Sequence, residues 1–209
     1  GNSAAELSVF RRLSGRKLSM KRPNILFAIA DDAGMHMGAY GCSWVDTPAF
    51  DRVAAEGVLF TNAYTPNAKC APSRAAILTG RNSWQLEAAA NHICVWPSKF
   101  RTWAEALRES GYAVGLTGKG WAPGDMGEID GQPRELIGPN YEAACLTPST
   151  DCISTLDYAE NFRHFLDDRR NDQPFCFWYG GLEPHRPYEY GSGVRQGGRS
   201  LEEIDRVYE

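Results

Sequence analysis

The sequence contains no long run of apolar residues. Its apolar stretches have the length of single strands, well short of the roughly 20 residues that a helix needs to cross a bilayer, so no membrane span is expected. Residues 1–20 lack the apolar core of a signal peptide. No internal repeat is apparent, which argues against solenoid and other repeat architectures.

An excess of charge of either sign is also missing. The 22 basic and 26 acidic residues leave a net charge of -4, which gives no general reason to bind nucleic acid. Six basic residues precede the first predicted strand: Arg11, Arg12, Arg16, Lys17, Lys21 and Arg22. We interpret residues 1–22 as a solvated N-terminal arm, with a binding patch as the alternative. Because 43% of the residues are hydrophobic, residues 23–209 can form one α/β domain with a substantial core.

The first informative feature is a pair of acids behind an apolar strand. Residues 24–30 are predicted to form a strand, and Asp31 and Asp32 follow it directly. In an open α/β sheet, ligands gather beyond the carboxyl ends of the strands. Carboxylate oxygens are the ligands that hard divalent cations prefer. The pair therefore predicts a site for Ca²⁺ or Mg²⁺, with an ordinary Asp-rich turn as the alternative.

The second feature is the run Cys-Ala-Pro-Ser-Arg at residues 70–74, which begins a predicted short helix. Pro72 suits the first turn because its missing N–H would have no intrahelical partner there. Cys70 then lies at the helix N-terminus, where free backbone N–H groups and the positive end of the helix dipole favour anions. Arg74, four residues on, lies over the same face. The run predicts a site for an anion.

Together, the two features resemble the signature of the type I sulfatases, the formylglycine-dependent members of the alkaline-phosphatase-like superfamily. The resemblance covers roughly residues 21–188 and implies that a maturation enzyme oxidises Cys70 to formylglycine. In that chemistry one hydroxyl of the hydrated aldehyde attacks sulfur, and the other later expels sulfate. The resemblance also implies that Asp31, Asp32 and the modified Cys70 bind the divalent cation. It implies a periplasmic, secreted or lysosomal location.

Two further positions match the same family. Lys119 lies in a Gly-Lys pair, and the resemblance implies that its ammonium group holds a sulfate oxygen. His185 lies in a Pro-His-Arg-Pro-Tyr run, and the resemblance implies that it reaches the sulfate and can protonate the leaving group. The catalytic set implied in this way is Cys70, Arg74, Lys119 and His185.

One position departs from the family pattern. Many sulfatases carry a histidine two residues after the lysine, whereas this sequence has Trp121. His92 could reach the site from another loop; the alternative is a surface or structural histidine.

The remaining elements fit the fold that the resemblance implies, a mostly parallel central sheet flanked by helices. We expect helices at residues 46–57 and 102–111 and strands at residues 58–64, 112–117 and 174–179. Residues 123–154 form a long segment rich in Gly and Pro. This segment, with Trp121 just before it, either shapes a sugar-binding cleft or forms a surface insertion. In the first case the candidate cleft residues are Trp121, Asp125, Glu128 and Arg134.

The function predicted from the resemblance is hydrolysis of a sulfuric ester in a sulfated sugar or aryl substrate. The order of the motifs is similar to that in N-sulfoglucosamine sulfohydrolases and related glycosaminoglycan sulfatases. Hydrolysis of phosphate or phosphonate monoesters is an alternative within the superfamily. The family's later metal ligands are not recognisable after His185. We therefore expect the chain to be the N-terminal part of a larger sulfatase, with weak or absent metal binding on its own, or a truncated non-catalytic homologue.

Overall fold

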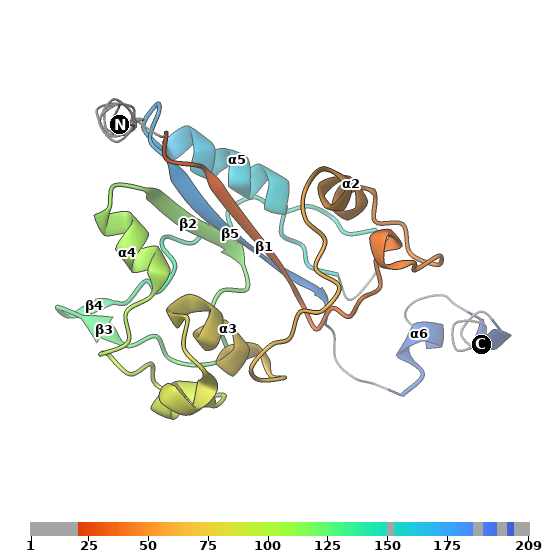
Figure 1. The fold of residues 1–209 in the computed structure, drawn as a ribbon, viewed down its shortest axis with the longest axis horizontal. Coiled ribbons are helices and arrows are strands. Elements are labelled where there is room, and N and C mark those ends of the chain that lie inside the picture. The colour runs from red at the N-terminus through yellow and green to blue at the C-terminus, as the bar shows by residue number, and fades with distance from the viewer. Residues whose placement is uncertain (1–20, 150–152, 186–189, 196–199, 203–209) are drawn as a thin grey trace, which may run out of the picture.

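The computed structural model describes residues 21–149, 153–185, 190–195 and 200–202. Its centre is a parallel sheet of three strands: β1 (Ile25–Asp31), β5 (Phe175–Pro184) and β2 (Ala113–Gly118), in the order β1-β5-β2. Ile25 pairs with Cys176, and Gly118 pairs with Gly180. Because all three strands run in the same direction, their carboxyl ends meet at one edge of the sheet (Figure 1).

Helices cover both faces of this sheet (Figure 1). On one face, Phe165 of α5 (Tyr158–Asp168) packs on Phe177, with 4.7 Å between the ring centroids. On the other face, Trp178 is fully buried in a core shared with α3 (Cys70–Thr79) and α4 (Trp103–Glu109). Phe177 and Trp178 serve opposite layers because successive side chains of a strand point to opposite faces.

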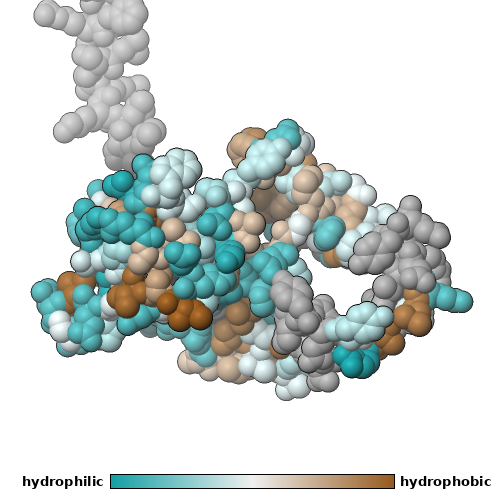
Figure 2. Space-filling view, turned by 90° about the horizontal axis from the view of Figure 1, so that it is seen from below, coloured by the Kyte–Doolittle hydropathy of each residue, from teal (hydrophilic) through white to brown (hydrophobic). Residues whose placement is uncertain are grey.

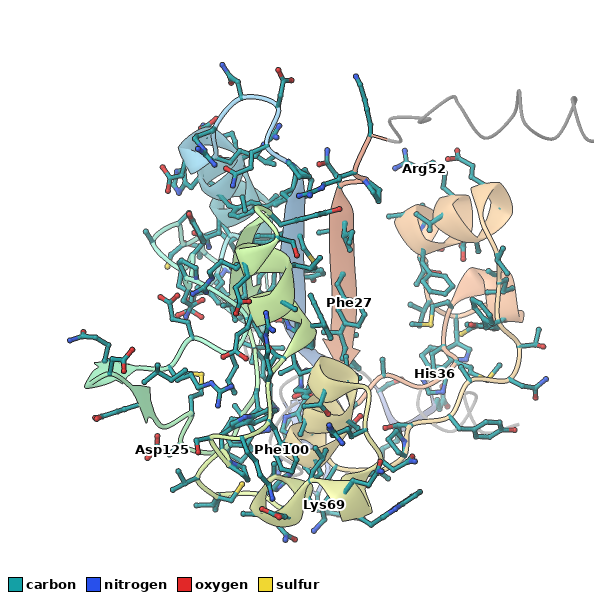
Figure 3. The ribbon with its side chains drawn as sticks, turned by 60° about the vertical axis from the view of Figure 1, so that its left-hand side comes forward. Phe27, His36, Arg52, Lys69, Phe100 and Asp125 are labelled. Carbon is teal, nitrogen blue, oxygen red and sulfur yellow. The ribbon has the colours of Figure 1, made fainter. Side chains whose placement is uncertain are left out.

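The other elements are short and lie around this centre. They are the helices η1 (Gly38–Tyr40), α2 (Pro48–Glu56), η2 (Ser83–Gln85), η3 (Glu87–Ala90) and α6 (Ser192–Arg195), and the hairpin strands β3 (Glu128–Ile129) and β4 (Gln132–Pro133). α2 lies beyond the β1 side of the sheet in the views of Figures 1 and 3. In the part of the chain that the structure describes, no helix is long and apolar enough to span a bilayer.

Most of the predicted elements are confirmed, and one strand is wrong. β1, β2, β5, α2 and α4 match the predicted segments, although β5 continues to Pro184. Residues 58–64 form no strand. No described strand pairs with this segment, and the side chains of Val58, Phe60 and Tyr64 are exposed. Figure 2 shows exposed hydrophobic areas between hydrophilic ones on one face of the molecule. Residues 1–20, most of the predicted arm, lie outside the described residues.

Candidate active site

The carboxyl ends of the three strands bring distant parts of the sequence together. β1 ends at Asp31, β2 is followed by Lys119, and β5 is followed by His185. The backbone N–H of Lys119 donates to the carbonyl of Gly180 at 2.8 Å, and that of His185 donates to the carbonyl of Asp31 at 3.1 Å. Asp31, Lys119 and His185 therefore lie together at this edge of the sheet.

Asp31 is the buried acid at the centre of the cluster. Its Oδ1 lies 3.2 Å from Nη2 of Arg74, and its Oδ2 lies 2.5 Å from Nζ of Lys119. Burial alone would raise the pKa of Asp31, but the hydrogen bonds and charges of Lys119 and Arg74 outweigh it and hold the pKa below its usual value. Asp31 is therefore an anion at neutral pH that orients two cationic side chains.

Arg74 ties α3 to the loop after β2. Its side chain is buried, and its Nη1 donates to the backbone carbonyls of Lys119 at 2.5 Å and Gly120 at 3.1 Å. The guanidinium also lies over the ring of Trp178, 5.9 Å from the centroid. These contacts fix the first turns of α3, and with them Cys70, relative to Lys119.

Cys70 is the first residue of α3, as predicted, with Lys69 as the N-cap. Figure 3 shows Lys69 on the side of the sheet toward which the strands run. The Sγ of Cys70 lies 3.3 Å from Nε2 of His92, a half-buried residue in the loop after η3. From the sequence, a place for His92 at the site was one of two alternatives, because nothing in the local sequence indicates which loop packs against α3.

Asp32 and His185 form a more exposed pair beside Asp31. His185 Nε2 lies 3.8 Å from Asp32 Oδ2, and the two side chains are 40% and 45% exposed. Asp32 has a φ of 58°, in the left-handed region that Asp tolerates better than most residues. The pair links the end of β1 to the segment after β5.

The described residues do not complete a metal site. Asp31 and Asp32 fit a hard cation in donor type, but Ca²⁺ takes about 6–8 oxygen ligands and Asp31 faces two cations. Among the described residues, no group of three or more His, Cys, Asp and Glu side chains could hold a metal ion. Cys70, the expected third ligand, contacts His92 instead of joining the two acids in such a group.

Two of the residues expected in a sugar-binding cleft are structural. Trp121 is buried and packs edge-on against Trp96, with 5.1 Å between the centroids. Arg134 is buried and donates to both carboxylate oxygens of Glu105, at 2.7 and 2.9 Å. Asp125 accepts a hydrogen bond from the N–H of its own loop at Gly127, 2.8 Å away. The side chains of all three make contacts within the protein, although Trp121 and Arg134 also line a pocket.

A pocket of about 710 Å³ lies beside the β3-β4 hairpin. Its lining includes Leu116, Trp121, Met126, Ile129 and Arg134. Among the described residues that line it there is no Cys70, Arg74, Lys119 or His185. The lining does include Gly118 and Gly120, so the pocket borders the backbone on either side of Lys119.

Comparisons with known proteins agree with this geometry. The sulfatase family model matches residues 23–202. An N-acetylglucosamine-6-O-sulfatase of Bacteroides thetaiotaomicron is 32% identical over 197 residues, which cover 87% of this chain and 34% of the relative. Human arylsulfatase A is 30% identical over an alignment that covers 88% of this chain and 46% of the relative.

A solved structure shows the same architecture. It is described as a complex with its substrate D-glucosamine-2-N,6-O-disulfate, superimposes with a TM-score of 0.59 at 28% identity, and is matched over 81% of this chain and 36% of its own length. The chain thus spans less than half the length of each of these three relatives. The described residues have the alkaline-phosphatase-like α/β fold, with a parallel sheet flanked by helices. The chain belongs to the sulfatase family.

Proposed function

We propose that the whole protein is a sulfuric ester hydrolase that releases sulfate from a sulfated carbohydrate or an aryl sulfate. The observation that carries this proposal is the packing of Asp31 against both Arg74 and Lys119, where the strands end and α3 begins. A helix N-terminus beside two cationic side chains is an environment that favours a sulfate group.

Each residue of the cluster has a proposed role. The Lys119 ammonium carries three N–H donors, and Asp31 takes one of them, so the others can hold a sulfate oxygen. Arg74 positions Cys70 and Lys119 through its contacts with Asp31 and with the carbonyls at 119 and 120. For His185, which is partly exposed beside Asp32, we propose the role of protonating a leaving oxygen or nitrogen.

Two groups that the polypeptide itself does not supply belong to the proposal. Formylglycine, made from Cys70 by a maturation enzyme, gives position 70 a hydroxyl nucleophile of a kind that no encoded side chain provides. A divalent cation, Ca²⁺ or Mg²⁺, at Asp31 and Asp32 would offset the negative charge of the sulfate. Its further ligands would come from residues outside those described.

The relatives favour sugars as the substrate class. The Bacteroides relative is named for N-acetylglucosamine-6-O-sulfate, and the solved structure holds a disulfated glucosamine. We therefore propose a sulfated amino sugar of the glycosaminoglycan type as the first substrate to test. A periplasmic, secreted or lysosomal location fits such a substrate.

The test is sulfate release by the whole protein, co-expressed with a maturation enzyme. The substrates are an aryl sulfate, 6-O-sulfated and N-sulfated glucosamine, and an aryl phosphonate as the competitor. The formylglycine content is read from the tryptic peptide of residues 70–74, which becomes about 18 Da lighter when the thiol becomes an aldehyde. We expect sulfate release from at least one sulfate and none from the Cys70→Ala variant. Release that survives this substitution, or faster cleavage of the phosphonate, would refute the proposal.

A further inference from the structure

The contact between Cys70 and His92 points to a site residue beyond the predicted set. We propose that His92 hydrogen-bonds and orients the nucleophilic group at position 70, supplying from the loop of residues 91–96 the imidazole that position 121 lacks. The contact is the 3.3 Å approach of His92 Nε2 to Cys70 Sγ. The inference rests on the proposed function, because it concerns the same nucleophile.

The loop that carries His92 is fastened to the segment that follows Lys119. Ile93 N–H donates to the carbonyl of Pro123 at 3.0 Å, and Asp125 N–H donates to the carbonyl of Cys94 at 2.8 Å. A third bond of 2.8 Å runs from Trp96 N–H to the carbonyl of Asp125. These bonds hold the two loops together, so His92 and Lys119 are positioned by one connected unit of backbone. Figure 3 shows Asp125 in the same lower part of the view as Lys69.

The backbone next to His92 is in a costly conformation. Ile93 has a φ of 54°, and its side chain is 85% exposed. A β-branched residue in the left-handed region is a genuine outlier, and such outliers gather at functional sites. Because the Ile93 side chain is exposed, its packing does not account for this conformation. The conformation does turn the chain immediately after His92, where the imidazole meets Cys70.

Trp121 does not provide the missing polar contact. Its side chain is 4% exposed and belongs to the hydrophobic core with Trp96, Ala71 and Leu78. Position 121 thus contributes packing beneath α3, and the imidazole comes from position 92. The chain therefore lacks the family's histidine at position 121 but has a histidine, His92, in contact with the nucleophile position.

The contact has a clear chemical meaning for the mature protein. The Sγ of Cys70 stands in for an oxygen on the same Cβ once the residue has been modified. An imidazole nitrogen can donate to or accept from such an oxygen and so fix its orientation toward the substrate. No proton needs to leave His92 for this role.

The experiment compares His92→Phe and His92→Gln with the control His164→Phe in the whole protein, co-expressed with the maturation enzyme. His164 lies on α5, is 40% exposed and pairs with Glu160 at 3.3 Å, away from the strand ends. Rates of sulfate release are divided by formylglycine content, so that incomplete maturation does not count as lost catalysis. We expect His92→Phe to lower kcat about 100-fold, because the nucleophile loses its orientation, with little change in KM; His92→Gln should retain more activity, and the control should match the wild type.

A second readout does not depend on activity. In protein made without the maturation enzyme and labelled with ¹⁵N-histidine, the ring nitrogen shifts of His92 are compared between the wild type and Cys70→Ala. We expect a shift at Nε2 of His92 and none at His164. The inference is wrong, and the function stands, if the wild type is active but His92→Phe matches the control. The inference is also wrong if the ring nitrogen shifts of His92 are the same in the wild type and in Cys70→Ala. If the matured wild type releases no sulfate, the proposed function fails, and the shifts still decide whether the contact exists.

Discussion

Replacing Arg134 by methionine should destabilise the protein strongly, because the guanidinium forms an ion pair that water barely reaches. The side chains of Arg134 and Glu105 are 4% and 15% exposed. Arg134 also donates to the backbone carbonyls of Ser98 at 3.2 Å and Phe100 at 2.8 Å. Removing one partner of a buried pair costs about 3–5 kcal/mol, since the other charge is left uncompensated. We expect the lower end, about 3 kcal/mol, because Glu105 keeps a hydrogen bond from Thr102 N–H at 2.8 Å.

The assay is urea unfolding at pH 7, followed by tryptophan fluorescence. With a denaturant slope of about 1–3 kcal/mol/M, the midpoint of Arg134→Met should fall by about 1–3 M. The matched control is Arg108→Met, because Arg108 pairs with Glu135 at 2.9 Å while both side chains are more than 40% exposed. Such a surface pair contributes about 0–1 kcal/mol. Equal midpoint shifts for the two variants would refute the reasoning. An Arg134→Met variant that kept its unfolding midpoint but bound a sulfated sugar less tightly would indicate that Arg134 binds the substrate.

Three further predictions concern Glu105, Gly115 and Lys119. Burial would raise the pKa of Glu105, but Arg134 and Thr102 outweigh it and hold the pKa below its usual value. This carboxylate therefore adds stability that is present above the unfolded pKa of about 4.3 and is lost as the pH falls through the folded pKa. The unfolding free energy of Glu105→Gln should vary less with acid than that of the wild type, and parallel acid-unfolding curves would contradict this. Gly115→Ala should cost about 1–3 kcal/mol by thermal unfolding, because the new Cβ would lie 2.9 Å from the Phe165 ring; an unchanged Tm would mean that the ring moves aside. In the matured whole protein, Lys119→Met should lower sulfate release about 100-fold or more, while Lys99→Met, at an exposed pair with Glu87, should leave it unchanged; equal rates would remove Lys119 from the site.

The parts of the fold that were predictable are those where local sequence and tertiary packing agree. The apolar residues of β1 and the acids that follow them indicate both a strand and its end. In a parallel sheet, ligands bind beyond the carboxyl ends of the strands, so the end of β1 lies where a site is expected. The Pro72 turn likewise marks a helix start that the structure confirms. In each case the signal lies within a few residues of the element that it predicts.

The parts that were missed depend on partners far along the chain. Residues 58–64 have a strand-like composition, but a strand also needs a neighbour, and the described residues provide none. The sequence around Arg134 indicates only a charged residue in a loop. Its ion-pair partner, Glu105, lies 29 residues earlier, on α4, where no local pattern connects the two. The contact between His92 and Cys70 likewise joins a loop to the start of α3, and no local pattern encodes their packing.

The two neighbouring acids of the site differ because of the strand that delivers them. Along β1 the side chains alternate, so that Phe27 and Ile29 turn toward the core while Leu26 is exposed. Asp31 continues the inward series, which brings its carboxylate to the buried Arg74. This position explains why Asp31 forms an ion pair with that arginine. Asp32 leaves the strand with a positive φ and stays exposed beside His185. A one-residue slip of β1 against β5 that put Ala30 at the inward position would turn Asp31 outward and leave Arg74 without a carboxylate. The strand register is therefore as much a part of the site as the acids themselves.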